Sequence, residues 1–204
     1  MKIFCIGRNY VDHALELNNP IPKSPIIFMK PPTAILAEGK PFYHPEFSKN
    51  IHFELELVLK IKKNGKSIQP EFASSYYDQV ALGIDFTARD LQDTCKEKGH
   101  PWEIAKAFDH SAVIGPFFSI DEVKSADGSI HFELLKNGQT VQSGSSDQMI
   151  FDFDSLIVHI SKYFTLQQGD LIYTGTPAGV GKIEIGDKLV GKIAEREGLH
   201  CEIK

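Results

Sequence analysis

The chain has 204 residues, of which 42% are hydrophobic and 24% are charged, and its formal net charge at pH 7 is −5. These values are typical of an ordinary globular protein with one substantial core, and the negative charge argues against nucleic acid as a partner. No segment approaches the ~20 consecutive apolar residues that a membrane-spanning helix needs, so we expect no membrane partner.

Short apolar segments bounded by turn residues predict a chain that is rich in β-strands. The first, residues 3–6, is too short for a signal peptide and has no small-residue cleavage site, so it is interpreted as a strand. Two Asn-Gly pairs, Asn64-Gly65 and Asn137-Gly138, follow strand-like segments and predict tight hairpins. The predicted strands cover residues 3–6, 26–29, 54–61, 80–85, 131–135, 140–143, 171–174, 188–190 and 201–203.

Helical periodicity is confined to a few segments, and it is clearest where the apolar residues of one face recur every three or four positions. The predicted helices cover residues 9–17, 72–77, 87–98 and 152–164. No repeat, low-complexity segment or shift in composition marks a second domain. We therefore predict a single α+β, predominantly β domain over residues 1–204, with a mixed β-sandwich or roll and a few peripheral helices.

The three cysteines, Cys5, Cys95 and Cys201, are widely separated and odd in number. They give neither the CxxC spacing of a metal site nor a disulfide framework. A reducing compartment suits such unpaired cysteines, so we expect a cytoplasmic protein.

Glu54 and Glu56 interrupt an otherwise apolar segment, residues 51–59. Side chains alternate between the two faces of a strand, so both carboxylates lie on one side, about 7 Å apart. Two ionised carboxylates are costly to bury without a counter-charge, and a hard divalent cation with oxygen ligands is the usual solution. The alternative is an edge strand that exposes an acidic face to solvent.

Asp85 and Lys106 are charged residues with apolar neighbours in sequence. Asp85 follows the apolar segment 80–84, where it could complete a carboxylate triad that holds Mg²⁺ or Mn²⁺ and stays open to a substrate. Alternatively, it is the N-cap of the next helix. Lys106 could place a half-buried ammonium near a substrate carboxylate or the acidic site, and the alternative is an ordinary surface lysine.

His13 and Glu16 are three residues apart on the first predicted helix and can share a face. A carboxylate beside an imidazole orients the ring and raises its basicity, as a general base that activates water requires. The alternative is a solvent-facing pair without a function.

The glycine-rich segment 174–181 follows a predicted strand and offers backbone N–H groups and threonine hydroxyls to a small anion. It contains neither the Gly-Lys-Ser/Thr of a Walker loop nor a GxGxxG sequence that opens a helix, so we do not expect nucleotide binding.

Together these segments resemble the fumarylacetoacetate hydrolase family over essentially the whole chain. The resemblance covers the family's catalytic domain alone, as in its short branch of acylpyruvases, oxaloacetate decarboxylases and 2-hydroxyhepta-2,4-diene-1,7-dioate isomerases. The matching motifs, in chain order, are Cys5-Ile6-Gly7-Arg8-Asn9-Tyr10 with His13 and Glu16, Phe28-Met29-Lys30-Pro31-Pro32, Glu54-Leu55-Glu56, Asp85-Phe86-Thr87-Ala88-Arg89-Asp90-Leu91-Gln92, Trp102 with Lys106 and Asp109, Thr165-Leu166 with Gly169-Asp170, and residues 174–181.

The resemblance implies a mixed β-roll, a homodimer and a set of site residues. The implied metal ligands, which hold Mg²⁺ or Mn²⁺ and in some relatives Ca²⁺, are Glu54, Glu56 and Asp85. The implied catalytic residues are His13 and Glu16, which activate water on a lid segment (residues 8–20), and Lys106, which contacts the substrate or the developing enolate. The residues implied to bind the substrate are Arg8, Lys30, Arg89, Gln92 and Thr176.

The activity implied by the resemblance is hydrolysis of a C–C bond in an acylpyruvate-type 2-oxo acid, within aromatic catabolism. An isomerase or an oxaloacetate decarboxylase would use the same metal site, because all three reactions stabilise an enolate. The pair of His13 and Glu16 favours hydrolysis, since tautomerisation needs no attack by water. A remote alternative is a protein that binds metal or an organic acid without turnover. Residues 94–101 lie where relatives differ in substrate contacts. The resemblance therefore does not identify the chemical group at the end of the substrate away from the 2-oxo acid.

Overall fold

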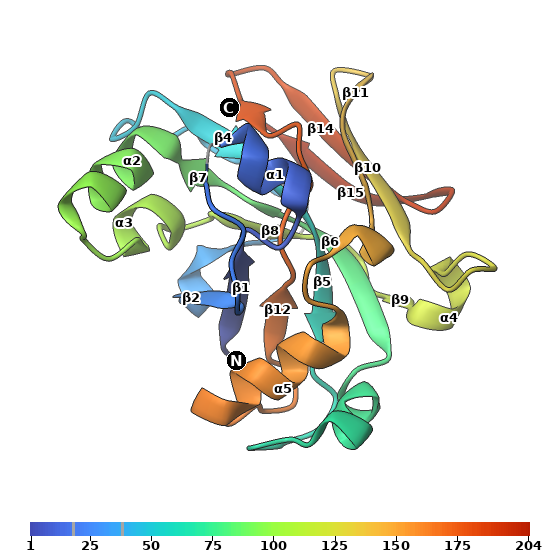
Figure 1. Ribbon diagram of the computed structural model, residues 1–204. Coiled ribbons are helices and arrows are strands. Elements are labelled where there is room, and N and C mark those ends of the chain that lie inside the picture. Colours follow the sequence, from blue (N-terminus) through green and yellow to red (C-terminus); the bar gives the residue numbers. More distant parts are fainter. Residues whose placement is uncertain (18, 38) are drawn as a thin grey trace.

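The computed structural model describes residues 1–17, 19–37 and 39–204 (Figure 1). Its largest sheet consists of β1 (Ile3–Gly7), β2 (Ile26–Lys30), β3 (Ile35–Leu36), β5 (Leu55–Lys60), β6 (Gln79–Asp85), β8 (Ala112–Ile114), β9 (Phe118–Ser119) and β12 (Leu171–Tyr173). The order is β2-β1-β12-β5-β6-β8-β3, and β9 pairs with β6. The sheet is mixed, because β1 runs parallel to β12 and β3 parallel to β8, whereas the other neighbours are antiparallel.

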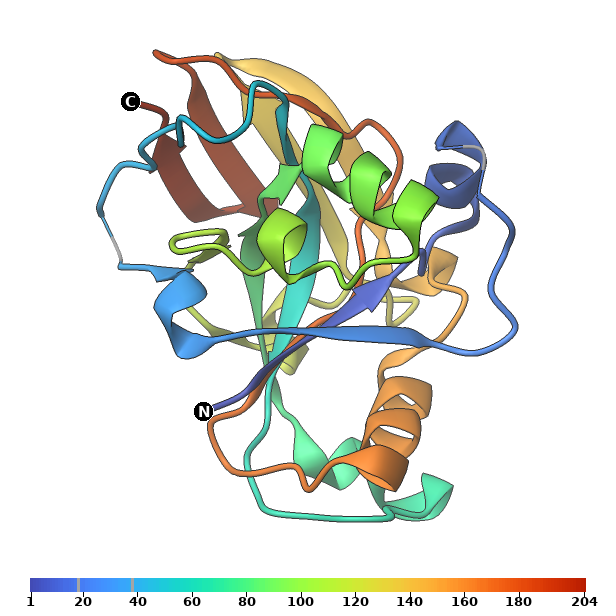
Figure 2. The same cartoon turned by 90° about the vertical axis from the view of Figure 1, so that its left-hand side faces the viewer.

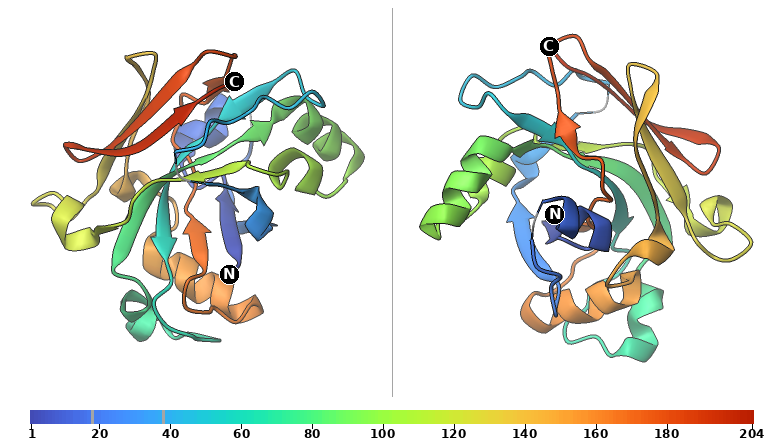
Figure 3. Two further views of the ribbon diagram at one scale, coloured as in Figure 1. Left: turned by 180° about the vertical axis from the view of Figure 1, so that it is seen from behind. Right: turned by 45° about the horizontal axis from the view of Figure 1, so that its top comes forward.

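A second sheet packs against the first across the main core. Its strands, in spatial order, are β11 (Gln139–Ser145), β10 (His131–Lys136), β14 (Lys188–Ile193) and β15 (Arg196–Glu202). Leu82 of β6 lies against Gly191 and Gly198, where an added Cβ atom would come within 2.9 Å and 3.2 Å of the leucine side chain. The two sheets therefore approach closely, and Figure 3 shows them curling around a shared interior. A small third sheet joins β13 (Gly181–Lys182), β4 (Ile51–Phe53) and β7 (Thr87–Ala88).

The helices lie on the periphery of the sheets (Figure 1). They are α1 (Val11–Glu16), α2 (Arg89–Lys98), α3 (Glu103–Lys106), α4 (Ile120–Val123) and α5 (Phe153–Tyr163), with 3₁₀ turns at Pro32–Ala34, Pro70–Tyr76 and Ser146–Gln148. Asp152 caps α5 by accepting a hydrogen bond from the Ser155 N–H at 2.8 Å, and the apolar face of the helix covers the core. Within the described part of the chain, no helix combines the length and apolar composition needed to cross a bilayer.

The predicted fold class, a predominantly β roll of the α+β class with peripheral helices, is confirmed. The hairpin at Asn137-Gly138 is confirmed as well: it joins β10 to β11, and both residues have the positive φ angles, 54° and 83°, that a tight hairpin turn requires.

The hairpin predicted at Asn64-Gly65 is wrong. Gly65 instead exchanges backbone hydrogen bonds with Leu166, at 2.9 Å and 2.8 Å, so the turn pairs with a segment about 100 residues away. The strands β5 and β6 do pair, but Pro70 and the 3₁₀ turn that it starts lie in the connection between them.

Several boundaries also differ from the prediction. The strand predicted over 54–61 corresponds to β5, and residues 51–53 before Glu54 form the separate strand β4. The helix predicted over 87–98 begins at Arg89, because Thr87 and Ala88 pair with β4. Ala88 is the N-cap of α2, so the alternative in which Asp85 caps this helix is wrong. The sequence patterns did not predict α3, α4 or the shortest strands, and the helix predicted over 72–77 is part of the 3₁₀ turn at Pro70–Tyr76.

Candidate active site

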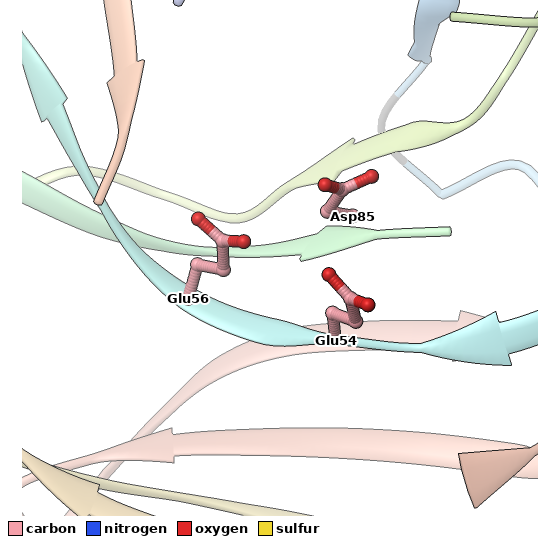
Figure 4. Close-up of side chains that lie close together, drawn as sticks. All are labelled: Glu54, Glu56 and Asp85. Atoms are coloured by element: carbon pink, nitrogen blue, oxygen red, sulfur yellow. The ribbon is translucent and has the colours of Figure 1, made fainter. Parts of the chain in front are cut away.

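Three buried carboxylates project from one face of the large sheet (Figure 4). Glu56 lies in β5, Glu54 immediately precedes β5, and Asp85 ends β6. Leu55 pairs with Ile84 across these antiparallel strands, and the Asp85 N–H donates to the Glu54 carbonyl at 2.9 Å. Cross-strand neighbours share a face, so one oxygen from each carboxylate lies within 4.8 Å of the other two.

Two lysines and an arginine supply positive charge to this triad. The Lys106 Nζ atom lies 2.7 Å from Glu54 Oε2 and 2.8 Å from Asp85 Oδ2. Arg89 Nη2 lies 2.5 Å from Glu54 Oε1, and Lys30 Nζ lies 2.7 Å from Asp85 Oδ1. Burial raises the pKa of Glu54, but Lys106 and Arg89 outweigh burial and hold this pKa well below its usual range. Burial lowers the pKa of Lys106, and the two carboxylates more than offset it, so the net pKa is raised.

Glu56 has no such cation among the described residues. Its Oε2 atom accepts a hydrogen bond from the Gly175 N–H at 2.7 Å. Burial and the negative charges of Asp85 and Glu54 raise the pKa of Glu56 well above its usual value. A hard divalent cation among the three carboxylates would remove this conflict, because carboxylate oxygens are the ligands that Mg²⁺, Mn²⁺ and Ca²⁺ prefer. The residues present therefore fit a divalent metal.

His13 and Glu16 lie together on α1. His13 is 5% exposed, and its Nδ1 atom lies 3.5 Å from Glu16 Oε2. Both oxygens of Glu16 also accept from the Gly179 N–H, at 3.1 Å and 3.2 Å, which ties α1 to the glycine-rich segment after β12. Burial lowers the pKa of His13 from its usual value of 6.5, so the imidazole is held neutral.

The start of α1 is fixed by Asn9, a buried residue to which the sequence reasoning gave no separate role. Its Nδ2 atom donates to the carbonyls of Phe151 and Thr174 at 2.9 Å and 2.8 Å, and its Oδ1 atom accepts from the Phe151 N–H at 2.9 Å. Gly175, which has a φ of 103°, lets this contact form, since a Cβ there would lie 2.7 Å from the Cβ of Asn9.

A cavity opens over the carboxylates. The predicted site residues that line it are Arg8, His13, Glu54, Glu56, Asp85, Arg89, Gln92, Lys106 and Thr176. They come from the turn after β1, from α1, from the paired ends of β5 and β6, from α2, from α3 and from the segment after β12. Residues of the lining that were not singled out as site residues include Ile6, Leu17, Phe28, Lys96 and Trp102.

Lys30 is the one residue of the predicted substrate-binding set that lies behind the carboxylates and not in the cavity lining. Besides its ion pair with Asp85, its Nζ atom donates to Ser111 Oγ at 2.9 Å and to the Lys106 carbonyl. The structure therefore places Lys30 where it fixes Asp85 and the backbone of Lys106.

Gln142 of β11 is a buried polar residue that the sequence reasoning missed. Its Oε1 atom accepts from the Leu55 N–H at 2.9 Å, and its Nε2 atom donates to Thr176 Oγ1 at 2.9 Å and to the Pro177 carbonyl at 3.0 Å. Gln142 thus links the strand that carries Glu56 to the threonine at the cavity. Nothing in its local sequence marks this role, because its partners are far away along the chain.

Known proteins with sequences similar to this chain differ in the reactions that their names give. The chain is 42% identical over 186 residues to the mitochondrial oxaloacetate tautomerase of Caenorhabditis elegans, covering 91% of this chain and 86% of that protein. It is 41% identical over 186 residues to the mitochondrial oxaloacetate decarboxylase of Dictyostelium discoideum, covering 91% and 85%. The crystal structure of fumarylpyruvate hydrolase from Pseudomonas aeruginosa, in complex with Mn²⁺ and pyruvate, superimposes with a TM-score of 0.92 at 36% identity, covering 100% of this chain and 89% of that one.

The family described as fumarylacetoacetate (FAA) hydrolase C-terminal matches residues 2–202, which is almost the whole chain. The match confirms the resemblance drawn from the motifs. It is consistent with a β-roll whose cavity carries three carboxylates that fit a divalent metal. The chain is an enzyme of the fumarylacetoacetate hydrolase family.

Proposed function

We propose that this enzyme hydrolyses a C–C bond in acylpyruvate-type 2-oxo acids and depends on a divalent metal, Mg²⁺ or Mn²⁺. The observation that carries the proposal is the His13–Glu16 pair: His13 lines the same cavity as the carboxylate triad, and Glu16 lies behind it at its Nδ1 atom, outside the cavity lining. A base that is oriented by a carboxylate is the group that a water-dependent reaction needs. The Pseudomonas hydrolase, solved with Mn²⁺ and pyruvate, supports the choice of reaction.

In this proposal Glu54, Glu56 and Asp85 would hold the metal, which would polarise the 2-oxo group of the substrate and stabilise negative charge on its oxygen. Arg89 and Gln92, joined by a hydrogen bond of 2.7 Å, present nitrogen donors to the substrate's carboxylate and keto oxygens.

His13 acts as the base. Glu16 lies beside its Nδ1 atom, so that nitrogen keeps its proton and Nε2 takes one from water. The resulting hydroxide adds to the distal carbonyl, the C–C bond breaks, and a carboxylic acid and the pyruvate enolate form. The Lys106 ammonium donates a hydrogen bond to the enolate oxygen as charge develops there, and the proton that His13 took from water passes to the enolate carbon, which yields pyruvate and restores the neutral imidazole.

A second candidate is tautomerisation or decarboxylation of oxaloacetate, which the similarity to the Caenorhabditis and Dictyostelium enzymes favours. Both reactions pass through an enolate and need no attack by water. They would use the triad and Lys106 in the same way and would depend less on Glu16.

The test is turnover of acetylpyruvate, fumarylpyruvate and oxaloacetate with Mg²⁺, each with and without EDTA. We expect pyruvate release from an acylpyruvate that EDTA abolishes. Turnover of oxaloacetate alone would replace the first candidate by the second. Tight binding of 2-oxo acids without any product would establish a binding protein and overturn both candidates.

We also propose, on the family resemblance, that residues 1–204 form one domain, that the protein is a homodimer and that it works in aromatic catabolism. The lid formed by residues 8–20 is part of the same proposal; it includes Asn18, which lies outside the described residues. A cytoplasmic location is supported by the three cysteines, which are buried and unpaired in the structure.

A further inference from the structure

Two cationic side chains at the cavity are not engaged by the carboxylate triad. Arg8, in the turn after β1, and Lys96, on α2, both line the cavity. Arg8 has no ion pair or side-chain hydrogen bond within the described residues. The carboxylate nearest to Lys96 is that of Asp93, at 3.7 Å, and its side chain is 59% exposed, so this pair is weak.

The other cations of the site already have anionic partners. Lys106 bridges Glu54 and Asp85, Arg89 contacts Glu54, and Lys30 contacts Asp85. These pairs leave Arg8 and Lys96 as two positive charges that face a cavity without an anion between them. Such an arrangement is unfavourable in the free enzyme and favours a negatively charged ligand group.

The helix fixes where this group would lie. Arg89, Gln92 and Lys96 have the spacing i, i+3, i+7, which places them on one face of α2, and all three line the cavity. Arg89 contacts Glu54 at the metal end, and Lys96 lies two helical turns further on, ~10 Å along the axis. Figure 2 shows α2 in front of the large sheet, and Arg8 directly follows β1 in the chain.

The surroundings of Lys96 agree with an anion at this place. Burial lowers the pKa of Lys96, Asp93 offsets only part of this effect, and the positive charges of Arg89 and Arg8 lower it further. A carboxylate between Arg8 and Lys96 would stabilise both charged forms. The backbone of Arg8 has a φ of 60°, a left-handed conformation that is costly for a residue with a side chain and that is common at functional sites.

We propose that Arg8 and Lys96 bind a second carboxylate at the end of the substrate away from the 2-oxo group, so that the enzyme selects dianionic 2-oxo acids. The inference rests on the proposed function for the position of the 2-oxo group over the triad. It identifies the distal group of the substrate, which the motifs did not specify, as a carboxylate. It also makes Lys96 a residue that determines specificity.

The test compares two 2-oxo acids of equal length that differ at one end, 2-oxoglutarate and 2-oxopentanoate. Neither is an acylpyruvate, so calorimetric binding in the presence of Mg²⁺ is measured without turnover. We expect 2-oxoglutarate to bind the wild-type enzyme at least about tenfold more tightly, as a charge-assisted hydrogen bond to a carboxylate warrants.

Lys96→Met should bring the ratio of the two dissociation constants close to one. The matched control is Lys98→Met, which removes the same charge from the exposed side of the same helix and should keep the wild-type ratio. An unchanged ratio in Lys96→Met, or no preference for 2-oxoglutarate in the wild type, would overturn the inference.

Turnover separates this inference from the proposed function. The ratio of kcat/KM for fumarylpyruvate over acetylpyruvate should fall at least about tenfold in Lys96→Met and stay constant in Lys98→Met. A binding preference without hydrolysis of either acylpyruvate would overturn the proposed function and leave the dianion site standing. Hydrolysis of fumarylpyruvate and acetylpyruvate with equal kcat/KM in the wild type would overturn the carboxylate site at Arg8 and Lys96 and leave the proposed function standing.

Discussion

Glu56 differs from the other two carboxylates of the triad in what surrounds it. Glu54 and Asp85 each contact a buried ammonium, whereas Glu56 accepts a hydrogen bond from the Gly175 N–H and faces two like charges. Replacing this carboxyl group removes a source of repulsion in the metal-free protein and removes a ligand from the metal-bound one. The same substitution should therefore affect the two states in opposite directions.

Glu56→Gln tests this difference, because glutamine keeps the acceptor for the Gly175 N–H. In EDTA we expect the Tm of the variant to equal or exceed that of the wild type. With Mg²⁺ at 100 times the wild-type Kd, the wild type should gain about 2.7 kcal/mol and the variant almost nothing. Turnover should fall at least about 100-fold.

The control for this comparison is Glu71→Gln, on the exposed 3₁₀ turn, which should keep both the metal response and turnover. If Mg²⁺ raised the Tm of Glu56→Gln as much as it raises the Tm of the wild type, the assignment of Glu56 as a metal ligand would be contradicted.

His13→Ala should reduce the hydrolysis of acylpyruvates much more than any turnover of oxaloacetate. Loss of a general base costs typically about 10²–10⁴-fold, and reactions without attack by water do not need this base. Steady-state rates on both substrates check the prediction, with Asp12→Ala on the exposed side of α1 as control. Equal losses on both substrates would argue against a role in activating water.

The buried state of His13 also predicts a pH dependence. Burial lowers its pKa from 6.5, so the neutral base persists as the pH falls below that value, and the acid limb of the kcat/KM profile should lie below pH 6.5. The unfolded chain takes up this proton near pH 6.5 and the folded one only at lower pH, so folding stability decreases as pH falls through that window. An acid limb of the kcat/KM profile that lies above pH 6.5 in the wild type and persists in His13→Gln would refute the assignment of His13 as the base.

At the scale of elements, the site depends on how α1 is attached to the rest of the protein. Asn9 makes three hydrogen bonds at the start of the helix, and Glu16 contacts Gly179 at its end. The short helix has few buried side chains of its own, so these contacts place His13 over the cavity.

Asn9→Ala should lower the free energy of unfolding by about 2 kcal/mol, because it leaves buried backbone groups of Phe151 and Thr174 without partners. It should also lower kcat more than it raises KM, since His13 loses its position. Denaturant unfolding and steady-state kinetics measure the two effects. Asn64→Ala, at an exposed side chain with one hydrogen bond, is the control, and equal stability of the two variants would contradict this role.

The strands that carry the site could be predicted from local pattern, but their partners could not. Alternation placed Glu54 and Glu56 on one face, and the apolar segment before Asp85 placed it at the end of a buried strand. The same Asn-Gly signal was correct at Asn137 and wrong at Asn64, because a distant backbone partner, Leu166, decided the second case.

The charged partners of the triad could be identified only from the folded structure. Nothing local shows that Lys106 bridges two carboxylates or that Lys30 lies behind Asp85, since these partners come together only when four separate segments meet. Gln142 and Lys96 were missed for the same reason. Family motifs supplied roles for several residues that spacing alone left open between a site and a solvent-exposed surface.

At the scale of the whole molecule, the cavity lies where the paired ends of β5 and β6 meet α1, α2, α3 and the segment after β12. The two sheets share one core, with Leu82 against the glycines of β14 and β15, which supports the proposal of a single domain. Such a core should unfold in one cooperative transition, and light scattering should give the mass of two chains for the proposed homodimer. Two separate transitions would contradict the single domain.

The central claim is that the carboxylate triad holds a divalent metal on which cleavage of an acylpyruvate depends. The most direct measurement is the initial rate of pyruvate release from acetylpyruvate and fumarylpyruvate as Mg²⁺ is returned to EDTA-treated enzyme. We predict that the rate rises from background and saturates in the wild type and stays at background in Glu56→Gln. A rate that EDTA does not change, or that Mg²⁺ restores equally in both proteins, would contradict the claim.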